Sequence, residues 1–370
     1  MLRIITIKDM VLFMYKKIIQ NITILLPIIT LIYAISLLFP YYIHDNEFFS
    51  INYFNHYKAT MMLVPTFSVI CSLLLSKKKL PYSIYIIYII YILYTIWSFL
   101  LVFFDCISLG NIIEKYYGVV TLLFSALILL FIYLAPSNIR AKYGFGFTNI
   151  LQGIIIIILF LFLYSIQSIS SYLIDNYTYR PFWEVFFDFD NCKVAISILF
   201  SFPLWFFSSY LFYFGEEYCW RFFLQNILQK KFGLRLGVII LGLIWGTWHL
   251  PLDMLESQLI SSEIPSFVVW LFRWLIHIVV CTSLSIFLGW VYIKTKNIWI
   301  VCFLHFLHNN LMVIFVNNIG ELNINSGVFS DYLLSLLFTF LAYVLCFGSF
   351  IFSKCYNQEN LYNEVINNEV

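Results

Sequence analysis

Two glutamates and one arginine stand inside an otherwise apolar run, at Glu216, Glu217 and Arg221. A single charged side chain at the centre of a bilayer costs roughly 2.5–3.5 kcal/mol on insertion scales, so three together predict a functional site. On a helix, Glu217 and Arg221 share one face and can neutralise each other. Glu216 points about 100° away from Glu217 and is left as a lone carboxylate, which suits a general base in a low-dielectric site. The alternative is an ion-pair network that only fixes helix packing.

Two further apolar segments carry histidines. His249 ends one of them two residues before Pro251, which predicts a break in the helix at this point. His305 and Asn309 are four residues apart in another segment, so they lie on one helix face. Each group also has a simpler interpretation. His249 can be a satisfied histidine at a helix end, and the other pair can join two helices by hydrogen bonds, worth about 0.6 kcal/mol on average in membranes.

Other polar residues and motifs give weaker signals. His277, four residues after Arg273, is interpreted as an interfacial residue near a segment end. The sequence contains neither the HExxH motif of zinc proteases nor the GxSxG motif of serine hydrolases. Its eight cysteines form no CxxC pair and stand mostly in apolar runs, so we interpret them as small core residues.

The composition is that of a membrane protein with many spans. Hydrophobic residues make up 62% of the 370 residues and charged residues only 11%. Soluble domains are about 45–50% apolar and about 25% charged. The net charge of +2 gives no indication of nucleic-acid binding. We therefore predict an all-α, polytopic bundle of transmembrane helices whose surroundings are the lipid bilayer.

The spans can be drawn directly from the apolar runs. Ten segments cover residues 19–42, 59–76, 81–104, 117–135, 148–172, 194–214, 237–251, 267–292, 298–317 and 332–353. The first is too long for the core of a signal peptide and has no A-x-A-like cleavage site, so we expect a retained span. Segments 59–76 and 237–251 are short, which gives a range of about 8–10 spans.

Basic residues fix the predicted orientation. Of the 21 Lys and Arg, 15 lie in flanks on one side of the spans: Arg3, Lys8, Lys16, Lys17, Lys77, Lys78, Lys79, Arg140, Lys142, Lys230, Lys231, Arg235, Lys294, Lys296 and Lys354. Positively charged loops stay in the cytoplasm, so both termini are predicted to be cytoplasmic.

This orientation creates a conflict over depth. Glu216 falls near the cytoplasmic end of segment 194–214, and His249 near the outer end of segment 237–251. A shared site needs both within about one water of each other. Either the first helix continues through residues 222–228, or the second segment is shallow and broken at Pro251. The apolar residues 222–224 favour the first solution and a site in the inner half of the membrane.

In this order, the three polar groups resemble the motifs of the CPBP family of intramembrane proteases, also called the Abi or CAAX-protease family. The pattern EExxxR corresponds to Glu216, Glu217 and Arg221, FxxxH to Trp245 and His249, and HxxxN to His305 and Asn309. Trp245 stands where the family usually has Phe, and we expect similar packing from it. The resemblance covers roughly residues 194–317, about a third of the chain.

The resemblance implies a reaction. Glu216, assisted by His249, takes a proton from water, and the nucleophile formed attacks a peptide carbonyl. His305 and Asn309 donate hydrogen bonds to the oxyanion that develops. The remaining motif residues, Glu217, Arg221 and Trp245, support the site. The expected substrate is a membrane-associated peptide or protein, and the expected activity is that of an intramembrane glutamic endopeptidase.

It also leaves alternatives open. Members of the family have been described as metalloproteases, so a zinc ion at Glu216, His249 and His305 is the alternative to a site without a cofactor. We favour the metal-free site because an Asn amide, as in the HxxxN motif, is a poor zinc ligand. A second alternative is a non-catalytic protein for bacteriocin self-immunity or scaffolding that uses the same motifs for packing or binding.

The same resemblance divides the chain into three parts. Residues 1–193 are expected to form an N-terminal transmembrane region of about five spans without a recognised motif. Residues 194–353 are expected to form the protease core, and residues 354–370 a polar cytoplasmic tail. The expected location is a bacterial plasma membrane, as an integral, multi-pass protein.

Overall fold

The protein folds as a bundle of helices. The computed structural model describes residues 51–75, 80–106, 110–175, 189–259, 265–319 and 329–357, and these residues contain helices and no strand. In lipid, a helix satisfies its backbone hydrogen bonds within one segment, which is why long apolar runs adopt it. The predicted all-α, polytopic class is confirmed. The expected first span, 19–42, lies outside the described residues.

The remaining nine expected segments correspond to helices. The long helices are α2 (Ile51–Leu75), α3 (Tyr82–Cys106), α4 (Gly110–Leu134), α6 (Ile150–Asp175), α8 (Phe189–Glu217), α10 (Leu234–Trp248), α12 (Ser266–Thr295), α13 (Ile298–Ile319) and α14 (Phe329–Cys346); α5 (Ser137–Lys142), α9 (Asn226–Phe232) and α11 (Leu250–Leu259) are short. Within the described ranges, six helical stretches are long and apolar enough to cross a membrane, and two shorter apolar helices accompany them.

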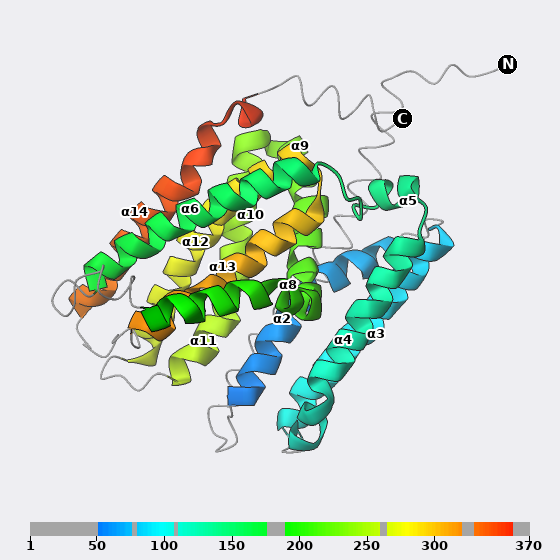
Figure 1. Cartoon of the computed structure of the whole chain (residues 1–370), viewed down its shortest axis with the longest axis horizontal. Coiled ribbons are helices and arrows are strands. Elements are labelled where there is room, and N and C mark those ends of the chain that lie inside the picture. Colours follow the sequence, from blue (N-terminus) through cyan, green and yellow to red (C-terminus); the bar gives the residue numbers. More distant parts are fainter. Residues whose placement is uncertain are drawn as a thin grey trace.

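The helices form two groups that meet at α8 (Figure 1). In one group, α3 packs against α2 and α4, and both α2 and α4 contact α8. In the other, α12 packs against α10 and α14, and α6 packs against α13 and α14. Helix α13 lies against α8 as well. Helix α8, which ends in the two glutamates, therefore lies between the two groups.

Close packing of α10 against α12 depends on two glycines. A Cβ atom on Gly242 would overlap the backbone of Thr282, and one on Gly246 would overlap Ile278. Small residues four apart let helix backbones approach in a membrane. The pair therefore holds the backbone of α10 directly against α12, one turn before His249.

Each of the two solutions to the conflict over depth has a counterpart in the structure. Helix α8 does not end at residue 214. It continues as a π-helical segment, Tyr218–Gln225, and then as α9. Helix α10 ends at Trp248, His249 caps it, and α11 begins at Leu250, so the helix breaks next to Pro251 as predicted. Short π-helical segments inside helices occur frequently at functional sites, and here one carries Arg221.

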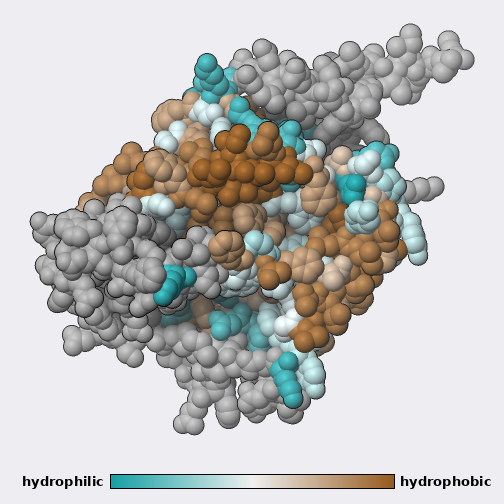
Figure 2. All heavy atoms as spheres, in the orientation of Figure 1, coloured by the Kyte–Doolittle hydropathy of each residue, from teal (hydrophilic) through white to brown (hydrophobic). Residues whose placement is uncertain are grey.

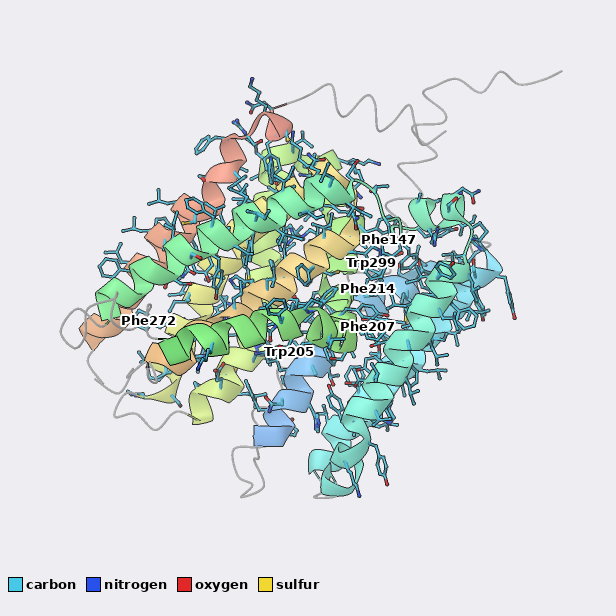
Figure 3. The ribbon with its side chains drawn as sticks, viewed as in Figure 1. Phe147, Trp205, Phe207, Phe214, Phe272 and Trp299 are labelled. Carbon is cyan, nitrogen blue, oxygen red and sulfur yellow. The ribbon has the colours of Figure 1, made fainter. Side chains whose placement is uncertain are left out.

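Aromatic side chains fill the interior, and aliphatic ones cover much of the outside. Trp299 of α13 stacks on Phe147 and on Phe214 of α8, with ring centroids 5.5 and 5.7 Å apart (Figure 3). On the surface, Figure 2 shows apolar side chains over α6 and over the group of α3 and α4. Large exposed apolar residues there include Leu122, Leu123, Tyr133, Ile154, Ile155 and Ile158. Such a surface suits contact with lipid chains.

Candidate active site

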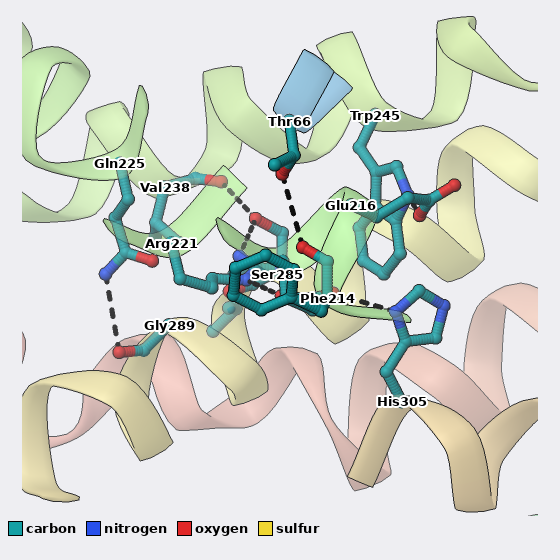
Figure 4. Close-up of polar contacts among 12 residues, drawn as sticks. Thr66, Phe214, Glu216, Arg221, Gln225, Val238, Trp245, Ser285, Gly289 and His305 are labelled. Atoms are coloured by element: carbon teal, nitrogen blue, oxygen red, sulfur yellow. Dashed lines mark hydrogen bonds and ion pairs between the residues drawn. The ribbon is translucent and has the colours of Figure 1, made fainter. Parts of the chain in front are cut away.

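Glu216 and Trp245 join the first motif to the second. Glu216 lies at the end of α8 and is buried, and the indole Nε1 of Trp245 donates a hydrogen bond to its Oε2 atom at 2.8 Å (Figure 4). A buried Trp N–H normally requires an acceptor. The aromatic residue of the second motif therefore does more than pack, because it also fixes one carboxylate oxygen of Glu216.

Glu217 and Arg221 form the ion pair that their spacing predicts. Arg221 Nε donates to Glu217 Oε2 at 2.7 Å, and both side chains have no exposed surface. Arg221 Nη1 also donates to the Oγ and carbonyl oxygens of Ser285 on α12, at 3.0 and 3.2 Å. The guanidinium carbon lies 5.3 Å from the ring centroid of Trp245. The pair therefore connects α8 to α12 and supports the indole that holds Glu216.

His305 contacts the second glutamate and not the first. Its Nδ1 atom lies 2.9 Å from Glu217 Oε1. Asn309 Nδ2 lies 3.3 Å from His305 Nε2, and Asn309 Oδ1 lies 3.1 Å from Nδ1 of His308. His305 therefore lies between the Glu217 carboxylate at Nδ1 and the Asn309 amide at Nε2. To donate to an oxyanion through Nε2, His305 has to release Asn309.

His249 occupies the position just after the last turn of α10. Its Nδ1 atom lies 3.0 Å from the carbonyl oxygen of Trp245. A carbonyl can only accept, so this contact places the proton on Nδ1 and leaves Nε2 without one. A bare Nε2 is the form of imidazole that accepts a proton from water.

The Trp245 ring is the common neighbour of the predicted catalytic groups. Its centroid lies 5.2 Å from that of His305 and 6.3 Å from that of His249, and its N–H holds Glu216. Glu216 and His249 share no hydrogen bond with each other. Asn309 lies at the exposed edge of the group, beside His305. Four of the other six motif residues therefore contact the Trp245 indole, and Glu217 and Asn309 join the group through Arg221 and His305. A gap remains between the two predicted water-activating groups.

Two residues next to His249 were not among the predicted site residues. Asp253 on α11 is fully buried and its Oδ1 lies 2.7 Å from Nδ1 of His277 on α12. The His277 ring stacks on that of His249, with centroids 4.7 Å apart and planes at 20°. His277 thus has specific partners on α10 and α11, and its interfacial position stays a prediction. The signal in the sequence was the spacing of His249 and Asp253, four residues apart across the Pro251 break.

The alternative zinc site does not fit the side chains as they lie. In the described parts of the chain, no three His, Cys, Asp or Glu side chains converge into a group that could hold a metal ion. Glu216 is bound by Trp245, His305 lies against Glu217, and His249 Nδ1 faces a carbonyl oxygen. We therefore derive no step through a metal.

The comparison with protein families finds a match in this part of the chain. Residues 198–311 match the family model described as type II CAAX prenyl endopeptidase, Rce1-like. The match contains all three motifs and lies inside region 194–353, and it confirms the family that the motifs resemble. The three-part division of the chain stays a prediction. Comparisons with curated proteins and with solved structures found no match.

Proposed function

On the premise that residues 198–311 belong to the Rce1-like type II CAAX prenyl endopeptidase family, we propose that Glu216 is the general base of an intramembrane endopeptidase. One observation carries the proposal, namely the different surroundings of the two glutamates. Glu217 is neutralised by Arg221 in a fully buried ion pair, whereas Glu216 accepts from the neutral indole of Trp245. Glu216 is thus the buried carboxylate without a cationic partner, and it is held in place.

In the proposed reaction, a water molecule lies between Glu216 and the bare Nε2 of His249. Glu216 takes one proton from this water as its oxygen attacks the carbonyl carbon of the substrate, and the C=O bond becomes C–O⁻. The Asn309 amide donates to this oxyanion, joined by His305 when its Nε2 carries a proton. The proton held by Glu216 passes to the bare Nε2 of His249, which becomes an imidazolium. The C–N bond then breaks as His249 gives this proton to the leaving amine, so that Glu216 and His249 return to their starting forms.

The proposed substrate is a membrane-associated protein or peptide. The site residues come from helices buried in an apolar bundle, and the outer surface of that bundle suits lipid. A substrate whose apolar part stays in the bilayer can bring its peptide bond to such a site without leaving the membrane. The family match adds that a lipid-modified C-terminal segment is the first substrate to test.

The metal-free reaction also belongs to the proposal. Glu216 and His249 supply the proton transfers, and Asn309 and His305 supply the oxyanion contacts. We therefore expect full activity of the purified protein after dialysis against a chelator. Loss of activity that returns with added zinc would replace this mechanism by the metal-dependent one.

The decisive experiment compares the full chain with its Glu216→Gln variant in lipid vesicles. The probe is an internally quenched peptide that ends in a farnesylated cysteine and three further residues, beside the same peptide without the lipid. Removal of a general base lowers kcat by about 10²–10⁴-fold, and Gln keeps the shape of the side chain. Glu256→Gln is the matched control, because this carboxylate pairs with Arg273 on α12 and lies outside the motifs.

The outcomes separate an enzyme from a binding protein. Cleavage that is lost in Glu216→Gln and kept in Glu256→Gln supports the proposal. Cleavage that survives Glu216→Gln overturns it. If neither peptide is cleaved by the wild-type chain, but a bacteriocin-exposed host is protected equally by both chains, the motifs serve binding or packing.

A further inference from the structure

We propose that Asp253 and His277 form a positioning dyad for His249: they hold its ring and stabilise the positive charge that it gains when it accepts a proton. The inference rests on the proposed role of His249 and goes beyond the three motifs. Neither Asp253 nor His277 belongs to them.

The first observation is the burial of Asp253. This carboxylate has no exposed surface, although the short helix α11 contains both polar and apolar residues. Its Oδ1 lies 2.7 Å from Nδ1 of His277, and Arg273 Nε is 3.9 Å away from the same oxygen. Arg273 is committed to Glu256, 2.5 Å from its Nη2 atom. Asp253 therefore has His277 as its close partner, and a buried carboxylate requires such a partner.

The second observation is the stack of the two imidazoles. His277 and His249 lie with ring centroids 4.7 Å apart and planes at 20°. Asp253 accepts from Nδ1 of His277, so it holds the His277 ring by its edge. That ring in turn covers one face of His249, and the Nδ1 contact with the Trp245 carbonyl oxygen fixes the rotation of His249 in its own plane. Together these contacts hold the His249 ring in one orientation.

The third step is electrostatic. When His249 accepts a proton it becomes an imidazolium, and a cation over the face of an aromatic ring is stabilised by the π electrons of that ring. Asp253, one ring further away, adds a negative charge in a low-dielectric surrounding, where charges act strongly on each other. This is the arrangement in which an aspartate orients a histidine and stabilises its charged form in other hydrolases.

Other charged and titratable groups also face His249. They are His305 from α13, Cys281 from α12, whose Sγ lies 3.7 Å from Nδ1, Lys58 from α2 and His277 itself. Lys58 is a cation, and each of the two histidines becomes one when it binds a second proton, so these three groups oppose a positive charge on His249. Asp253 is the buried carboxylate in contact with His277, and its negative charge offsets theirs, so it is the charge to remove.

The test measures kcat and KM separately with the farnesylated quenched peptide, in lipid vesicles. The variants are Asp253→Asn, Asp253→Ala, His277→Phe and the Asp253→Asn/His277→Phe double variant. Partners that orient a histidine in metal sites are worth about 10–100-fold, and we expect losses of this order in kcat. KM should stay within about twofold, because substrate binding is not altered.

The order of the variants distinguishes positioning from simple stabilisation. Asn keeps an oxygen that accepts from His277, so Asp253→Asn should retain more activity than Asp253→Ala. The double variant should be no worse than its worse single variant, because residues that act as a unit are not additive. Thr60→Val in α2, whose hydroxyl pairs with Ser98, is the control that leaves the dyad and its neighbour Arg273 intact.

Glu216→Gln is measured in the same assay. If the Glu216→Gln variant cleaves the peptide as fast as the wild-type chain, the proposed function is overturned, whatever the dyad variants show. If Glu216→Gln is inactive while Asp253→Asn and Asp253→Ala match the wild-type kcat, the dyad proposal alone is overturned. Additive losses in the double variant, or losses confined to KM, overturn it too. Only protein that elutes as a single species is compared, and the isosteric Asn variant covers the case in which Ala prevents folding.

Discussion

The two groups of helices place polarity inside the membrane in different ways. In α2, α3 and α4, buried side chains pair through hydroxyl groups: Thr60 with Ser98 at 2.7 Å and Tyr94 with Thr121 at 3.0 Å. No buried side chain described in these three helices is a carboxylate or a guanidinium. Around α10 to α13, the buried polar groups include charged ones: Glu216, Glu217, Arg221 and Asp253.

Hydroxyl pairs and buried charged groups serve different purposes in this bundle. A hydroxyl pair is neutral and can join two helices at a small cost in free energy. Its removal leaves no unpaired charge in the membrane. A buried charge is costly and needs a partner of opposite sign or several hydrogen bonds. A chain that only needs to hold its helices together has no reason to bury four charged groups. Their concentration within the matched region therefore supports the proposal that this part of the molecule carries the active site.

The largest expected effect comes from removal of one partner of the buried ion pair. Arg221→Met leaves Glu217 as an uncompensated charge, which costs about 3–5 kcal/mol. We expect the free energy of unfolding, measured by denaturant titration in mixed micelles, to fall by this amount. The Oγ and carbonyl oxygens of Ser285 lose their donor as well.

The control for this change removes both charges. In the Glu217→Gln/Arg221→Met double variant no bare charge is left, and buried ion pairs replaced by neutral groups are often tolerated. Most of the lost stability should return. A double variant as unstable as the single one would mean that Arg221 acts through Ser285 and not through Glu217.

A smaller effect is expected at Trp245. The Trp245→Phe variant keeps an aromatic ring, as the family pattern does, but loses the N–H that binds Glu216 and part of a buried ring system. A hydrogen bond to a charged group is worth about 1.5–3 kcal/mol, so kcat/KM should fall by at least about tenfold. The smaller ring also leaves a cavity, so some stability should be lost as well. An unchanged kcat/KM would show that Glu216 is held by other contacts.

Most of the fold could be predicted from the sequence, because each helix is set by a local apolar run. Nine of the ten drawn segments have a helix, and the tenth lies outside the described residues. Local spacing also predicted the Glu217–Arg221 pair. The continuation of α8 beyond residue 214 is one of the two solutions that the sequence offers, whereas its π-helical geometry is not predicted; Pro251 predicts the break after α10.

The contacts between helices were harder to predict. Trp245 and Glu216 are 29 residues apart, and the indole N–H reaches the carboxylate only because α10 packs at a particular rotation. The same holds for His305, whose partner is Glu217, and for the pairing of Asp253 with His277 across 24 residues. Periodicity assigns a residue to a helix face, but the opposing residue depends on how the helices pack.

The smallest expected effect concerns the hydroxyl pair in the first group of helices. Thr60→Val keeps the shape of a buried side chain and removes its hydrogen bonds to the Oγ and carbonyl oxygens of Ser98. Such bonds between membrane helices are worth about 0.6 kcal/mol on average, and the denaturant titration should show a loss of this size. Peptide cleavage should be unchanged, because neither residue contacts the motif residues. The comparison of the two helix groups depends on this small loss of stability. If Thr60→Val destabilised the protein as much as Arg221→Met, hydroxyl pairs and buried charges would contribute equally to stability. Buried charge alone would then no longer distinguish the site from the rest of the bundle.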